Sequence, residues 1–152
     1  MNRLYFENYN DDWRMQTTGR TISEYDIMQF VTLVGLTEAL FVDMQYLREE
    51  THYQRRLAPG SLSFSFAEGL VIGSGLLNGT GMAYLGGDSR IHAPVYVDDT
   101  IHVEMSLQDK RATSKPDRGI VTTYNQVFNQ DNTMVLEYWP KRMIKRKSTP
   151  AE

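Results

Sequence analysis

Three carboxylates stand where the chain could use them for acid–base chemistry. Glu68 lies inside an apolar segment, so we expect it to pair with Arg, Tyr or backbone groups, or to titrate with a raised pKa. Glu38 could act as an acid or a base if it is buried, and is a plain exposed carboxylate if it is not. Asp43 is expected to accept hydrogen bonds from nearby backbone N–H groups as a local cap. Glu68 is therefore the carboxylate that needs either a structural partner or a role in a site.

Tyrosine and histidine offer fewer options for chemistry. Tyr84 could point into a pocket as a hydrogen-bond donor, although an aromatic residue on a strand is usually part of the core. His52 precedes the central apolar segment and could reach its start, or be an ordinary loop residue. His92 and His102 fall on expected strands without a second ligand at metal spacing, and the chain has no cysteine. We expect no metal, no cofactor and no cysteine nucleophile.

The apolar segment at residues 59–77 must position these groups. Pro59-Gly60 is a turn signal, and Ser61 is a candidate N-cap. Apolar residues then fall on every side, which predicts a helix that is buried all round. The first turn, at Gly60 and Ser61, presents unpaired N–H groups at the positive end of the helix. These groups could bind a carbonyl oxygen or a developing enolate.

Shorter signals frame this helix. Ser23 and Asp26 resemble a capping box, residues 27–34 keep helical spacing, and Gly35 is a helix stop. An irregular segment is expected over 36–43 and a short helix over 44–51. A first strand is expected within 13–22. Four later strands are expected over 81–93, 101–107, 120–129 and 133–144. The first of these four has a bulge at 86–88, and the last two are joined by a hairpin turn at 130–132. One long helix followed by antiparallel strands predicts an α+β fold.

Length and composition limit the possibilities further. We expect one domain over residues 1–152, with peripheral segments at 1–12 and 145–152. The formal net charge of −3 argues against a nucleic-acid partner. No apolar run follows a basic start, and the apolar stretch at 70–77 is too short to span a bilayer. We therefore expect a cytoplasmic protein without a membrane partner.

The order of these signals resembles the MaoC-like dehydratase family, the hot-dog fold of (R)-specific enoyl-thioester hydratases. Ala58-Pro59-Gly60 precedes the central helix, and residues 90–100, RIHAPVYVDDT, are similar to the family's RFxxPVxxGDT segment. Asp98 stands where the family usually has glycine. The resemblance implies an antiparallel sheet wrapped around a long central helix. It also implies a homodimer or higher homo-oligomer whose sheets join edge to edge.

The catalytic signature of that family is altered in this chain. Family hydratases carry a pattern close to G-D-x-N-P-[IL]-H-x-D after the first helix, whereas residues 35–43 read GLTEALFVD. Leu36 and Phe41 occupy the catalytic Asp and His positions. Hydration of an enoyl thioester needs a base for the water and an acid for Cα, and neither side chain can serve. The resemblance leaves Gly60, Ser61 and Glu38 as candidate catalytic positions, and Leu36, Phe41, Asp43, Tyr84 and Glu68 as candidate substrate-binding positions.

Three interpretations follow from the loss of the dyad. The pocket is repurposed for an intramolecular cyclisation of Diels–Alder type in natural-product biosynthesis, which needs near-attack geometry rather than proton transfer. Alternatively, the chain is a hydratase or dehydratase that uses substitute residues. In the third interpretation it is a non-catalytic acyl-binding subunit or heterodimer partner. In each case the ligand is an acyl or polyketide-type chain, free or as a thioester of CoA or a carrier protein.

Overall fold

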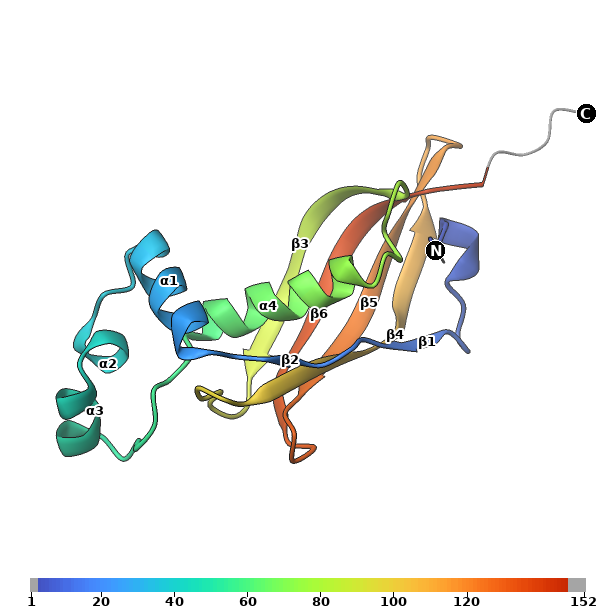
Figure 1. Ribbon diagram of the computed structural model, residues 1–152. Coiled ribbons are helices and arrows are strands. Elements are labelled where there is room, and N and C mark those ends of the chain that lie inside the picture. Colours follow the sequence, from blue (N-terminus) through green and yellow to red (C-terminus); the bar gives the residue numbers. More distant parts are fainter. Residues whose placement is uncertain (1–2, 148–152) are drawn as a thin grey trace, which may run out of the picture.

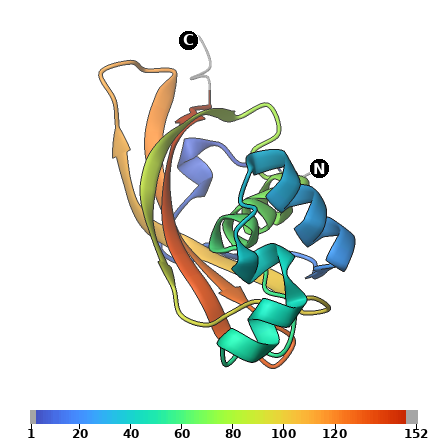
Figure 2. The ribbon, with the colours of Figure 1, turned by 90° about the vertical axis from the view of Figure 1, so that its left-hand side faces the viewer.

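The computed structural model describes residues 3–147 and shows a curved antiparallel sheet around one helix, α4 (Gly60–Gly73) (Figure 1). The strands are β1 (Arg14–Gln16), β2 (Arg20–Thr21), β3 (Gly81–Ile91), β4 (Thr100–Ala112), β5 (Arg118–Phe128) and β6 (Met134–Lys145). The sheet order is β1-β4-β5-β6-β3, and β2 also pairs with β4. Figure 2 shows the concave side of the sheet turned toward α4. The expected α+β fold, a sheet wrapped around a central helix, is confirmed.

The central helix is shorter and less enclosed than the sequence suggests. It ends at Gly73, four residues before the expected end, because Gly75 takes a left-handed conformation (φ 83°) and turns the chain. Its N-cap is Pro59, and Ser61 is an exposed residue inside the first turn, so the N-cap prediction for Ser61 is wrong. The prediction of burial all round is also wrong for this single chain, since Ile72 is 55% exposed.

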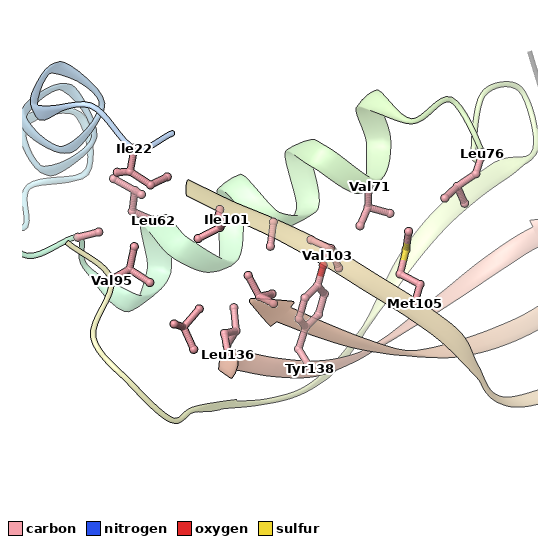
Figure 3. Close-up of a cluster of buried hydrophobic side chains, with 14 of the residues drawn as sticks. Ile22, Leu62, Val71, Leu76, Val95, Ile101, Val103, Met105, Leu136 and Tyr138 are labelled. Atoms are coloured by element: carbon pink, nitrogen blue, oxygen red, sulfur yellow. The ribbon is translucent and has the colours of Figure 1, made fainter. Parts of the chain in front are cut away.

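The core lies between α4 and the concave side of the sheet (Figure 3). Leu62 and Val71 of α4 pack with Ile101, Leu136 and Tyr138 of the sheet, and all five are almost fully buried. Burial of each such aliphatic side chain contributes about 1.5–3 kcal/mol. This packing fixes the height of α4 above the sheet and therefore the position of its first turn.

Three further helices lie beyond the N-terminal end of α4 (Figures 1 and 2). The helix α1 (Glu24–Val34) has the expected Ser23–Asp26 capping box and ends at Gly35 with φ 77°. The helix α2 (Ala39–Val42) occupies part of the segment expected to be irregular. The helix α3 (Met44–Glu50) begins after Asp43, whose Oδ1 accepts from the N–H groups of Gln45 (2.9 Å) and Tyr46 (3.0 Å). The prediction that Asp43 acts as a local cap is confirmed.

The strand β3 forms a free edge of the sheet and is exposed over nearly all its length. Its register against β6 shifts between Tyr84 and Gly86, close to the expected bulge. The strands β5 and β6 form the expected hairpin. None of the helices within residues 3–147 is long and apolar enough to cross a membrane.

The segments expected to be peripheral are tied to the fold where the structure describes them. The short 3₁₀ helix η1 (Phe6–Asn8) brings Phe6 and Tyr9 into the core. At the other end, Arg146 Nε donates to Glu7 Oε1 at 2.9 Å. Residues 1–2 and 148–152 of these two segments lie outside the described residues. The described parts therefore contribute to the packing instead of lying outside it.

Candidate active site

A cavity of about 310 Å³ lies at the first turn of α4. The helix supplies Gly60 and Ser63, and the segment after β3 supplies the opposite wall. The remaining lining residues are mostly apolar and comprise Phe41, Tyr53, Leu57, Ala58, Ile91, His92, Ala93, Pro94, Val95, Val135 and Leu136. Figure 3 shows Val95 at the first turn and Leu136 below it, on the sheet. A concave apolar pocket with a few polar groups is the usual form of a small-molecule site.

The start of α4 provides two free backbone N–H groups, of which Gly60 lines this cavity and the exposed Ser61 does not. The N–H groups of Leu62 and Ser63 donate to the carbonyl of Pro59, at 2.9 and 3.1 Å. The N–H groups of Gly60 and Ser61 have no acceptor among residues 3–147. A Cβ atom at Gly60 would lie 2.2 Å from Ile91 Cδ1, so glycine allows the close approach of β3. The first turn can therefore offer its free donors to a carbonyl oxygen.

The segment at residues 90–100 holds the helix start in place. Ala58 N–H donates to the Val95 carbonyl at 2.8 Å, and Val97 N–H donates to the Arg56 carbonyl at 2.9 Å. The buried Asp99 carboxylate accepts from Tyr96 N–H at 2.9 Å and stabilises the turn. Asp98 has φ 71°, a conformation that favours glycine and explains the family preference at this position.

The segment that carries the altered dyad contributes one residue to the cavity. Phe41 lines it, and Arg56 Nη1 donates to the Phe41 carbonyl at 2.8 Å. Arg56 Nε also contacts Glu24 Oε1 at 2.9 Å and so ties α2 to α1. Leu36 is half-buried against the core and does not line the cavity. Glu38 is exposed and Asp43 caps α3, so neither carboxylate reaches this cavity.

Sequence reasoning missed a polar cluster beside this cavity, of which His92 alone lines the cavity. His92 Nε2 lies 3.0 Å from Glu137 Oε1, and the Tyr124 hydroxyl donates to Glu137 Oε2 at 2.6 Å. The hydrogen bond from Tyr124 is the main cause that holds the pKa of Glu137 below its usual value of 4.5. The three residues come from three neighbouring chain segments, and Arg90, two residues before His92, lies opposite Glu137 in the register. Only that register could have revealed the cluster.

Glu68 and Tyr84 line a different cavity, of about 580 Å³, beside the second half of α4. The Tyr138 hydroxyl donates to Glu68 Oε1 at 2.8 Å, and Arg142 forms an ion pair with Glu68. The expectation that Glu68 finds Arg and Tyr partners is confirmed. Burial, and then the negative charge of Glu68, raises the pKa of Tyr138 far above its usual range. Glu68 and Tyr84, like Glu38 and Asp43, therefore do not line the cavity at the first turn of α4.

The described residues contain no group of three His, Cys, Asp or Glu side chains that could hold a metal ion. The cavity at Gly60 instead combines a backbone donor with the side chains of His92 and Tyr53, and His92 is paired with Glu137 outside the cavity lining. Such a set can polarise a carbonyl group and transfer a proton.

A sheet wrapped around one helix, with a site at the helix start, is a hot-dog fold. A Mycobacterium tuberculosis protein with a double hot-dog fold has a TM-score of 0.85 and 22% identity, over 98% of this chain and 47% of that chain. The family model described as MaoC like domain matches residues 6–128, so the chain belongs to this family of dehydratases and hydratases.

Two further solved structures resemble the chain over nearly the full length of both partners. One is a monoamine oxidase regulatory protein from Archaeoglobus, with a TM-score of 0.87 and 26% identity over 97% of this chain and 98% of that chain. The other is an R-hydratase from Pseudomonas aeruginosa, with a TM-score of 0.78 and 24% identity over 99% of this chain and 93% of that chain. The comparison with curated proteins found no match.

Proposed function

We propose that the chain hydrates, or in reverse dehydrates, an acyl thioester and uses His92 with Glu137 in place of the missing dyad. The observation that carries this proposal is that His92 lines the same cavity as Gly60 and lies 3.0 Å from Glu137. Membership of the MaoC-like family and the similarity to an R-hydratase support the reaction class. Among the interpretations open after the loss of the dyad, we choose the hydratase with substitute residues over the cyclisation, because a paired histidine suits proton transfer.

The geometry suggests how the reaction would proceed. The Glu137 carboxylate holds a proton on His92 Nε2, which leaves Nδ1 as the basic nitrogen. The thioester carbonyl accepts hydrogen bonds from the free N–H groups of Gly60 and Ser61. His92 Nδ1 takes a proton from water while the hydroxide adds to Cβ, and the imidazolium returns that proton to Cα. One water is added to the double bond, and His92 ends neutral.

The test is hydration of crotonyl-CoA, followed by loss of the enoyl absorbance. His92→Gln should lower kcat by at least about 100-fold, the usual contribution of a positioned acid–base group. His102→Gln is the matched control, because His102 lies on β4 and does not line the cavity. If His92→Gln has the same kcat as the wild type, another group must transfer the proton. No turnover by the wild type would remove the hydratase proposal.

Cyclisation of an acyl or polyketide-type chain is the second candidate. The mostly apolar lining, with Phe41 at the former histidine position, favours it. The donors of Gly60 and Ser61 would activate a conjugated carbonyl, and the lining would hold the reacting carbons close together. Conversion of a linear polyene thioester that is unaffected by His92→Gln would support this reaction. A non-catalytic subunit would give neither reaction and would co-purify with a homologous partner.

We also propose that two copies join through their β3 edges to form a homodimer. Such an edge presents unpaired backbone groups, and here it carries the exposed side chains of Met82, Leu85 and Ile91. Ile72 of α4 adds a further exposed apolar side chain. Pairing of two β3 strands would satisfy the backbone groups and cover this apolar surface.

A further inference from the structure

We propose that the Ser63 hydroxyl is a further catalytic group, which donates a hydrogen bond to the thioester oxygen as negative charge develops there. Ser63 belongs to α4 and lines the cavity at Gly60. The inference rests on the proposed function, because it assigns one more residue to the reaction at that cavity. Burial, the lack of a partner and the direction of the side chain together single out this serine.

The Ser63 hydroxyl is buried without a structural use. Ser63 is 4% exposed. A serine within a helix usually points to solvent or donates to a carbonyl of the preceding turn, as the Ser74 hydroxyl does to the Val71 carbonyl at 2.6 Å. The carbonyl available to Ser63 in this way is that of Pro59, which accepts from the N–H groups of Leu62 and Ser63 instead. Within residues 3–147 no hydrogen bond is formed by the Ser63 hydroxyl.

The hydroxyl oxygen of Ser63 opens into the cavity. In the part of the chain that the structure describes, the unpaired polar side-chain atoms that are closed off from solvent belong to Thr123 and Asn125. Ser63 Oγ is not one of them, so this oxygen reaches open space, and the cavity at Gly60 is the space that Ser63 lines. The hydroxyl is therefore available to a bound molecule.

The helix directs this hydroxyl toward Gly60. Residues three apart lie on the same face of a helix, and each Cα–Cβ bond tilts toward the N-terminus. Ser63 follows Gly60 by three residues, so its side chain leans toward the free N–H group of Gly60. One oxygen atom in the cavity can accept hydrogen bonds from both groups.

Hydration of an enoyl thioester forms the charge that these donors stabilise. As hydroxide adds to Cβ, the electron pair of the double bond moves toward the thioester oxygen and gives an enolate. The Gly60 N–H and the Ser63 O–H donate to this oxygen, which is more negative than the original carbonyl. Cα then takes its proton from the His92 imidazolium, and Ser63 keeps its own proton throughout. Ser63 therefore binds the transition state more strongly than the substrate.

The first experiment measures polarisation of the carbonyl without turnover. Butyryl-CoA labelled with ¹³C at the carbonyl has no double bond to hydrate, and hydrogen bonds to its oxygen move the carbonyl resonance downfield. Binding to the wild type should produce this displacement, and Ser63→Ala should reduce it. Ser65→Ala is the matched control, because Ser65 lies on the same helix, is exposed and does not line the cavity. An equal displacement in the wild type and Ser63→Ala would overturn the proposal.

The second experiment measures hydration of crotonyl-CoA. Ser63→Ala should lower kcat about 100-fold with little change in KM, since removal of one donor to an oxyanion usually costs about 10²–10³ in kcat. Ser65→Ala should keep the kcat of the wild type. Turnover that is unchanged in Ser63→Ala, or a change in KM alone, would remove Ser63 from the mechanism. Absence of turnover by the wild type would remove the reaction itself, which is a different result.

A stability measurement separates loss of catalysis from loss of the fold. A buried hydroxyl without a partner is unfavourable for folding, and both variants place the better helix former, alanine, on α4. Ser63→Ala should therefore unfold at a higher urea concentration than Ser65→Ala, which removes an exposed hydroxyl. A more stable and less active Ser63→Ala is the expected result. A less stable Ser63→Ala would mean that the hydroxyl serves the fold, and would overturn the proposal.

Discussion

Glu137 illustrates how one hydrogen bond couples the site to pH. Its folded-state pKa is held below 4.5, first by the hydrogen bond from Tyr124. A depressed carboxyl pKa stabilises the fold above the unfolded value, and this stability is lost as the pH falls through the folded value. Tyr124→Phe should therefore raise the pKa of Glu137 toward 4.5, as measured by NMR titration of its carboxyl carbon. The control Tyr46→Phe, on the exposed helix α3, should leave the pKa of Glu137 unchanged. If the pKa of Glu137 is also unchanged in Tyr124→Phe, the hydrogen bond from Tyr124 is not what lowers it.

Asp98 carries the left-handed backbone of the turn after β3. At φ 71° a β-carbon is unfavourable by roughly 1–2 kcal/mol, and Asp is tolerated there better than most residues. We expect Asp98→Gly to be more stable than Asp98→Ala by about 1 kcal/mol in urea denaturation. Equal stabilities of the two variants would show that the turn relaxes to another conformation.

Among the elements, α4 is linked to β6 by the ion pair between Glu68 and Arg142. Removal of one partner leaves a largely buried charge, so Glu68→Leu should lower the free energy of unfolding by about 3 kcal/mol. The double variant Glu68→Leu/Arg142→Leu should recover part of this loss, because no unpaired charge remains. Guanidinium denaturation of the singles and the double gives the coupling energy. Simple addition of the two losses would show that the pair is not coupled.

For the whole molecule, the free edge of β3 makes a prediction about assembly. Leu85→Glu should convert the proposed homodimer to a monomer, because charge on an edge strand opposes pairing. Leu33→Glu is the control, since Leu33 on α1 is even more exposed but lies away from that edge. Sedimentation velocity distinguishes the two species. A wild type that is monomeric, or a dimer that survives Leu85→Glu, would contradict assembly through β3.

Local patterns account for what could be predicted from the sequence. The Ser23–Asp26 capping box, the stop at Gly35, the cap by Asp43 and the β5–β6 hairpin depend on neighbours a few residues apart, and the structure confirms each. The family resemblance extended these signals to the hot-dog fold. The partners of Glu68 were also foreseeable in kind, because a carboxylate in an apolar helix requires compensation.

The composition of the site depended on tertiary structure. Strand register brings His92, Glu137 and Tyr124 together across three segments, and no spacing along the chain reveals it. The length of α4 keeps Glu68 away from Gly60, because Glu68 lies more than one turn further along the helix. Tyr84 is also distant, because it lies near the start of β3, whereas Ile91 beside Gly60 is its last residue. The sequence by itself determined the α+β class, the ends of α1 and the β5–β6 hairpin, because those follow from local backbone preferences and burial. Tertiary structure decided which side chains share a cavity. The long-range pairing of strands sets the distances between residues that are far apart in the sequence, and local sequence patterns do not predict that pairing.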